Sequence, residues 1–270
     1  MTGVRAAQHG ARRLAFTVWA AILSLFCGLV FVGLTLLTIS AWLGNRGHTQ
    51  TNPVVDLGFF ALGAVIIGTG FAAQLRAPEH HIAGLQQAGL GLLALSLAGL
   101  LGGRIEPLMD PLLFLLAAAI LVALHPAGGE FFRRGETVSS PLVVLAILGA
   151  IPALAYAAHM LVLARGAGPS CFLGGCARGD RYAEMAAVAI AVVLLGLLAA
   201  ARTQGWRLPA WSAGTAAIIV GLASCVLPDV PGSVGQACGA LAVVWGVLFV
   251  AVAEWQGRRV AGRGGVRRVA

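Results

Sequence analysis

Lysine is absent from this chain of 270 residues, in which all 18 basic residues are arginine. A protein without lysine cannot form the Schiff base that holds retinal or pyridoxal phosphate, and it cannot supply the lysine of a phosphate-binding P-loop. The GxSxG nucleophile elbow, the zinc-binding HExxH motif, the paired aspartates of intramembrane proteases and a Gly-rich phosphate loop are missing too. These absences make an enzyme the less favoured reading.

Charged side chains are scarce as well. They make up 10% of the residues, whereas hydrophobic residues make up 59%, and the mean hydropathy is +0.90. This composition lies outside the range of soluble domains, and several apolar runs reach the roughly 20 residues that cross a bilayer. No acidic residue or arginine falls at the middle of such a run, which argues against a carrier that moves protons through buried acids. The sequence therefore predicts an integral membrane protein.

The apolar runs predict an all-α, polytopic transmembrane helix bundle without a soluble domain. A basic N-terminus, residues 1–13, precedes a single bundle over residues 14–255, and an Arg-rich tail covers residues 256–270. A proline at position 152 predicts a kink or break in the fifth span. The eight expected spans are residues 14–39, 56–75, 81–102, 111–126, 141–163, 185–201, 212–227 and 238–255.

Arginine placement predicts the orientation of the bundle. With both termini in the cytoplasm, 13 of the 18 arginines lie inside, and those left outside are Arg46, Arg104, Arg165, Arg178 and Arg181. This bias follows the positive-inside rule. We expect a multi-pass protein of the plasma membrane whose basic surplus meets anionic inner-leaflet lipid and not nucleic acid. Residue usage rich in Ala, Gly and Arg is typical of a GC-rich bacterial genome.

The third span carries a stripe of small residues at steps of three or four, which keeps them on one helix face. Leucines occupy the other faces, so the stripe predicts a central helix that other backbones approach closely. The stripe consists of His80, Gly84, Gln87, Gly91, Ala94, Ala98 and Gly102.

Polar side chains gather where this stripe reaches the cytoplasmic end. At 1.5 Å per residue, His125 on the fourth span lies about as deep as Gln87 on the third. We expect a pocket for a small ligand or a lipid headgroup there, although such amides and imidazoles more often only bond helices together. The pocket candidates are Gln74, Gln86, Gln87 and His125, with Glu79, His80 and His81 at the mouth.

The same histidines allow an alternative in which the protein binds haem. A b-type haem in a membrane bundle is held by two imidazoles from different helices. Only His80 or His81 paired with His125 comes close to this requirement, and their difference in depth counts against it. No metal site of another kind is expected.

A second polar group lies at the outer ends of the fifth and sixth spans. His159 and Glu184 could form an acid–base pair at the membrane surface and act on lipid, with Tyr156, Asp180 and Arg181 nearby. Residues of this kind more often form an ion-paired network at helix ends, so His159 and Glu184 are weak catalytic candidates.

Two cysteines bracket a short Gly-containing turn on the predicted outer side. Because that compartment is oxidising, we expect a disulfide between Cys171 and Cys176, with two free thiols as the alternative. Cys225 and Cys238 flank the last outer turn, and the sequence leaves open whether they pair.

Several stretches resemble uncharacterised multi-pass membrane proteins of high-GC actinobacteria. They are RAPEHHIAGLQQ (residues 76–87), LHPAGGE (124–130), CARGDRYAEM (176–185) and GWRLPAWSAG (205–214). The resemblance implies a source and no activity, cofactor or site residue. From the residues we expect a non-catalytic role, which is transport-like, ligand-sensing or that of a complex partner, for a neutral or amphiphilic molecule. A protein partner or a second copy of the chain stays open.

Overall fold

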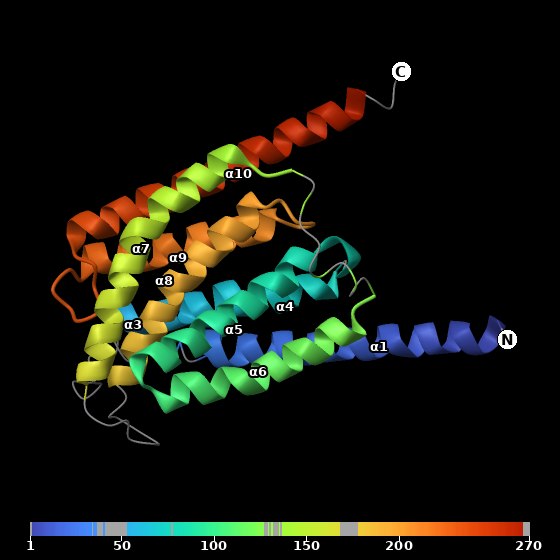
Figure 1. Cartoon of the computed structure of the whole chain (residues 1–270), viewed down its shortest axis with the longest axis horizontal. Coiled ribbons are helices and arrows are strands. Elements are labelled where there is room, and N and C mark those ends of the chain that lie inside the picture. The colour runs from blue at the N-terminus through green and yellow to red at the C-terminus, as the bar shows by residue number, and fades with distance from the viewer. Residues whose placement is uncertain are drawn as a thin grey trace.

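The computed structural model describes residues 2–33, 35–36, 40, 53–76, 78–126, 129, 131, 135, 137–167 and 178–266. Within these ranges eight helices are long and apolar enough to cross a membrane, so the predicted all-α bundle of eight spans is confirmed. The start of the first helix and the end of the last project beyond the same end of the bundle (Figure 1). We call this the termini end and the opposite one the loop end.

The first four spans are built from α-helices with shorter π and 3-10 segments between them. These are α1 (Thr2–Cys27), the π-helix η1 (Gly28–Val32), α3 (Pro53–Phe60), the π-helix η2 (Ala61–Gly68), α4 (Thr69–Ala72), the 3-10 turns η3 (Ala73–Leu75) and η4 (Pro78–His80), α5 (Ile82–Gly102) and α6 (Ile105–Leu124). Together α3, η2, α4 and η3 form the second span.

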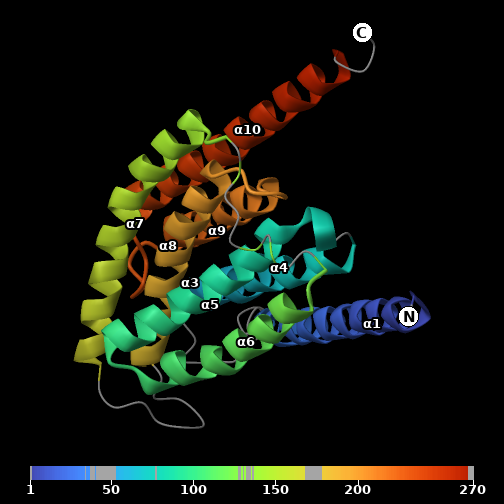
Figure 2. The ribbon, with the colours of Figure 1, turned by 45° about the vertical axis from the view of Figure 1, so that its right-hand side comes forward.

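Four long helices make the other spans. They are α7 (Ser140–Gly166), α8 (Arg178–Ala200), α9 (Arg207–Val226) and α10 (Gln236–Val266). In both views α7 and α10 lie on one side of the molecule, while α1 and α6 lie on the other (Figures 1 and 2). Between these outer pairs run the second span, α5, α8 and α9.

The small stripe on α5 is buried as predicted, apart from the exposed His80 that precedes the helix. Its glycines admit other backbones: a Cβ atom on Gly70 of α4 would lie 2.5 Å from the carbonyl oxygen of Gly84. Although α5 is central, α8 is the most completely enclosed span, because its alanines pack against α5, α7 and α9.

Glycines also set the approach of α9 to α10. A Cβ atom on Gly246 would lie 2.5 Å from the carbonyl oxygen of Gly214, and one on Gly221 would lie 2.6 Å from that of Gly239. The two antiparallel backbones therefore touch near both ends of the pair. This contact holds the starting turns of α9 beside the final membrane turns of α10.

Several helices extend beyond the predicted spans, and the fifth span differs from the prediction in its interior. The helix α8 begins at Arg178 and not at residue 185, because its first turn carries Asp180, an acidic residue that suits a helix N-terminus. The helix α10 continues to Val266, well into the Arg-rich tail, and arginine is a good helix former. The helix α7 runs unbroken through Pro152, so there is no break at this residue.

Candidate functional site

The amide of Gln87 is the centre of a buried polar cluster near the termini end. This side chain is 0% exposed, and its Nε2 atom donates to the carbonyl oxygen of Ile66 at 2.7 Å. The same nitrogen lies 2.9 Å from the hydroxyl oxygens of Thr69 and Ser212. One side chain of α5 therefore joins the second span and α9. We call Gln87, Thr69 and Ser212 the Gln87 cluster.

The π-helix η2 contains the backbone carbonyl groups to which this cluster donates. A return from an i→i+5 to an i→i+4 bonding pattern skips one backbone carbonyl group, and η2 makes this return beside Ile66 and Thr69. The Thr69 hydroxyl donates to the carbonyl oxygen of Val65, and Gln87 supplies a donor to Ile66. The Oε1 atom of Gln87 is buried without a hydrogen-bond partner in the described part of the chain.

Gln74 performs a similar task one turn closer to the termini end. It is 1% exposed, and its Nε2 atom donates to the carbonyl oxygen of His81 at 2.9 Å. This bond fixes the residue that precedes α5. The backbone N–H of Ala83 donates to the carbonyl oxygen of Gln204 at 2.9 Å, so the α8–α9 turn also binds the start of α5.

His125 follows α6 and is 2% exposed. Its ring meets Phe16 of α1 edge to face, with 5.1 Å between the ring centroids. Burial lowers the pKa of His125 below its ordinary value of 6.5, and this effect is opposed by a hydrogen bond to the Pro78 backbone and by the Glu79 carboxylate. The ring therefore joins α1 and α6 to the turn before α5.

The lowered pKa predicts that this joint weakens in acid. Below pH 6.5 His125 binds a proton in the unfolded chain but not in the folded protein, where its pKa is lower. The free energy of unfolding therefore decreases as the pH falls, by at most about 1.4 kcal/mol per pH unit. We expect the melting temperature in detergent to fall from pH 7.5 to 5.5, and less steeply for His125→Gln. The exposed His159→Gln is the control, and an equal slope in all three proteins would contradict the prediction.

The other predicted pocket residues lie around the start of α5, on different helices and turns. The Nε2 atom of Gln86 donates to the carbonyl oxygen of Phe131, while Glu79 and His80 are exposed. Gln74, Gln87 and His125 are each enclosed by protein. The structure thus brings the predicted residues to the same end of the bundle, where most of them connect helices.

The haem alternative does not fit this arrangement. His125 is packed against Phe16, whereas His80 is exposed on the turn η4. His81 lies beside the α8–α9 turn, where a Cβ atom on Gly205 would be 3.3 Å from its Nδ1 atom. The imidazoles therefore face different surroundings, and a haem would need two of them on one cavity. The described residues also contain no group of three or more His, Cys, Asp or Glu side chains that could hold a metal ion.

A groove opens beside His81, between the starting turns of α9 and the last membrane turns of α10. Its volume is about 460 Å³. It is lined by His81, Gly205, Trp206, Arg207, Leu208, Trp211 and Glu254. We call it the inner groove. The Nδ1 atom of His81 is buried there without a hydrogen-bond partner among the described residues.

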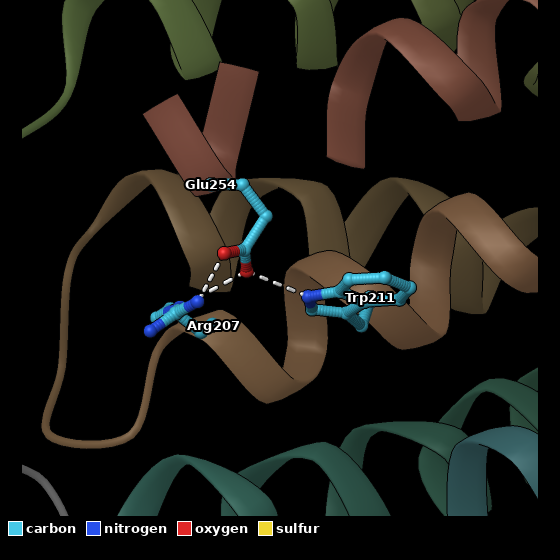
Figure 3. A network of polar contacts seen from close by, with 3 residues as sticks. All are labelled: Arg207, Trp211 and Glu254. Carbon is cyan, nitrogen blue, oxygen red and sulfur yellow. Dashed lines mark hydrogen bonds and ion pairs between the residues drawn. The ribbon is translucent and has the colours of Figure 1, made fainter. Parts of the chain in front are cut away.

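Three of these side chains form a network that spans the groove (Figure 3). Arg207 and Trp211 lie four residues apart on one face of α9, and both reach Glu254 of α10. The Nε atom of Arg207 donates to Oε1 of Glu254 at 3.0 Å, a second guanidinium nitrogen donates to Oε2, and the indole N–H of Trp211 donates to Oε1 at 2.8 Å. Arg207 packs over Gly257, one turn after Glu254.

Sequence reasoning missed this network. Trp206 and Trp211 fit the pattern of aromatic anchors near span ends, and Glu254 is the only acidic residue after Asp229. A lone acid at the end of the last span, opposite an arginine at the start of the preceding one, was the available signal. It becomes informative only when α9 and α10 are known to touch.

The weak catalytic candidates at the loop end have different surroundings. His159 is exposed on α7, whereas Glu184 of α8 forms an ion pair with Arg181, with 3.0 Å between Nη1 and Oε2. The Arg181 guanidinium also lies 4.9 Å from the centre of the Phe59 ring on α3. Glu184 therefore belongs to an ion-paired joint between α3 and α8, as helix-end charges commonly do.

Another arginine at the loop end, unlike Arg181, is almost fully buried. Arg104, in the turn between α5 and α6, is 6% exposed and donates from Nε to the carbonyl oxygen of Ala164 at 2.9 Å. A further nitrogen donates to the carbonyl oxygens of Ala164 and Ala167. These groups end α7, where a helix lacks its own donors and favours positive charge.

The predicted disulfide between Cys171 and Cys176 lies outside the described residues. Among those that the structure does describe, Cys27, Cys225 and Cys238 are free thiols. Cys27 is buried in α1, and the Sγ atom of Cys225 faces the carbonyl oxygen of Gln236 at 3.5 Å.

The arrangement can thus do two things. The buried amides hold the second span, α5 and α9 in fixed positions. The inner groove offers a carboxylate, a guanidinium, an imidazole and two indoles to a molecule at the membrane surface. Eight apolar helices fit a multi-pass membrane protein. No family model matches the chain, and no curated protein or solved structure matches it either.

Proposed function

We propose that the protein is a non-catalytic membrane protein that binds an amphiphilic molecule in the inner groove. The observation that carries this proposal is the groove itself, in which charged, aromatic and imidazole side chains share one open space at the adjoining ends of α9 and α10. Ligand sites combine apolar walls with a few polar groups that fix orientation. Binding of an amphiphile is the step common to transport-like, ligand-sensing and complex-partner roles.

The apolar part of such a molecule has a surface to lie on. Along α10 the exposed side chains of Val247 and Val244 continue from Glu254 toward the loop end, and on α9 Leu222 is exposed. Trp211 is 48% exposed at the groove and has the amphipathic shape that favours headgroup depth. A headgroup in the groove and a tail along these helices would be continuous.

We further propose that the termini end faces the cytoplasm of a bacterial cell. Helix ends and turns at the termini end carry Arg12, Arg76, Arg202 and Arg258, whereas those at the loop end carry Arg104, Arg165 and Arg181. Cationic residues concentrate on the cytoplasmic side of membrane proteins. The inner groove would then meet the inner leaflet.

This function predicts that the purified protein retains an amphiphile. We expect native mass spectrometry to show a bound species on wild-type protein, and its occupancy to fall about five- to ten-fold in Trp211→Ala, because an aromatic wall of the groove and a hydrogen bond to Glu254 are lost.

Trp255→Ala is the matched control. Trp255 is also 48% exposed and lies on α10 at the same end, but it does not line the groove. We expect its occupancy to equal that of wild type. Equal loss in both variants would mean that any interfacial tryptophan holds lipid, and no loss in Trp211→Ala would refute binding in the inner groove.

A further inference from the structure

The charges of the inner groove are balanced within the groove. Its lining contains one arginine and one carboxylate, which are paired with each other, and a histidine. We propose that its ligand is a phospholipid whose headgroup carries both a phosphate and a primary amine, with the phosphate on Arg207 and the ammonium on Glu254. This inference rests on the proposed function and names its ligand class.

The ion pair in the groove can be exchanged for such a headgroup. The Arg207 side chain is 54% exposed and that of Glu254 is 21% exposed, so solvent screens their attraction and the pair adds little to stability. A zwitterion offers each partner an opposite charge in return. Guanidinium binds phosphate through two parallel hydrogen bonds, and an ammonium with N–H groups donates to a carboxylate.

His81 adds an imidazole to the lining of the groove. Its Nδ1 atom is buried without a hydrogen-bond partner among the described residues, and buried polar atoms in folded proteins are rarely left so. A Cβ atom on Gly205 would lie 3.3 Å from Nδ1, so this nitrogen lies beside the α8–α9 turn.

The acid distinguishes this ligand from a purely anionic lipid. Arginines outside the groove, such as Arg258, would attract any phosphate, but Glu254 stands inside the groove between Arg207 and Trp211 (Figure 3). A headgroup with negative charge alone would have to displace the carboxylate without replacing its partner. A primary ammonium replaces that partner and can also lie on the exposed Trp211 ring.

The test is a competition between lipids of identical dioctanoyl chains, read by native mass spectrometry of the delipidated full-length protein. The three probes are phosphatidylethanolamine, which has a primary amine, phosphatidylcholine, which has an amine without N–H groups, and phosphatidylglycerol, which has none. We expect wild-type protein to bind phosphatidylethanolamine about ten-fold more tightly than phosphatidylglycerol, with phosphatidylcholine between them. We expect Glu254→Gln to reduce that preference to less than about two-fold.

Each outcome decides a separate point. Wild-type protein that binds phosphatidylglycerol as well as phosphatidylethanolamine, or a preference that survives in Glu254→Gln, would overturn the zwitterion inference and leave amphiphile binding intact. If all three lipids bind equally to wild type and to Trp211→Ala, the proposed function fails as well. The melting temperature of each variant is measured in parallel, and Trp255→Phe is expected to keep the wild-type preference.

Discussion

Replacing Gln87 by leucine is expected to lower the free energy of unfolding by about 2–4 kcal/mol, since a buried group left without its partner costs roughly 1–3 kcal/mol. Leucine matches the size of the amide but cannot donate, so the carbonyl of Ile66 and the hydroxyls of Thr69 and Ser212 lose a buried partner. Interhelical hydrogen bonds in membrane proteins average somewhat less than this range for each bond, and here three contacts are lost at once.

The measurement is the melting temperature of purified protein in detergent, with neighbouring Gln86→Leu as the matched control. Gln86 is half-buried on the same helix and makes one hydrogen bond, to the Phe131 backbone. We expect its loss to stay near or below about 1 kcal/mol. Equal stability of the two variants would contradict the central position that the structure gives to the Gln87 cluster.

Gly246→Ala is expected to destabilise the protein by about 3 kcal/mol, although it adds a single methyl group. The new Cβ atom would lie 2.5 Å from the carbonyl oxygen of Gly214 and 2.8 Å from Ile218, and a backbone atom cannot rotate out of the way. The helices α9 and α10 would have to separate. Because they carry Arg207, Trp211 and Glu254, the same change is expected to reduce amphiphile occupancy of the inner groove.

Gly89→Ala provides the control for this substitution. Gly89 lies within α5, and a Cβ atom there would meet nothing within 4 Å. Alanine is the better helix former by about 1 kcal/mol, so the variant should melt at or slightly above the wild-type temperature. Equal melting temperatures of the Gly246→Ala and Gly89→Ala proteins would show that α9 and α10 do not touch at this point.

Features set by composition could be predicted from the sequence. Runs of about 20 apolar residues define spans whatever their neighbours are, which is why the eight crossings and the all-α class are confirmed. The stripe from Gly84 to Gly102 was predictable because only small residues allow close approach of helices. The cytoplasmic orientation, the membrane and the partners stay predictions.

Features that depend on pairs of helices could not be predicted. Gln87 and Gln74 were predicted as pocket residues, but their side-chain N–H groups donate to the carbonyl oxygens of Ile66 and His81. The Gln87 bond lies beside the π-helix η2, which carries no sequence signature. The sequence suggested Glu184 as an acid–base partner of His159. In the structure α8 begins at Arg178, so Glu184 lies one turn after Arg181 and pairs with it. The inner groove could not be predicted without knowing which helix packs against the glycines of α9.

The buried hydrogen bonds of the Arg104 guanidinium distinguish the loop end of the bundle from the termini end. Separating the guanidinium from Ala164 and Ala167 would remove the hydrogen bonds that it donates to the last carbonyls of α7. Rearrangements that accompany exchange of a ligand are therefore least costly where the ion pair of Arg207 is open to solvent. The loop end is thus held by buried hydrogen bonds, whereas the groove carries an ion pair that a ligand can reach from solvent.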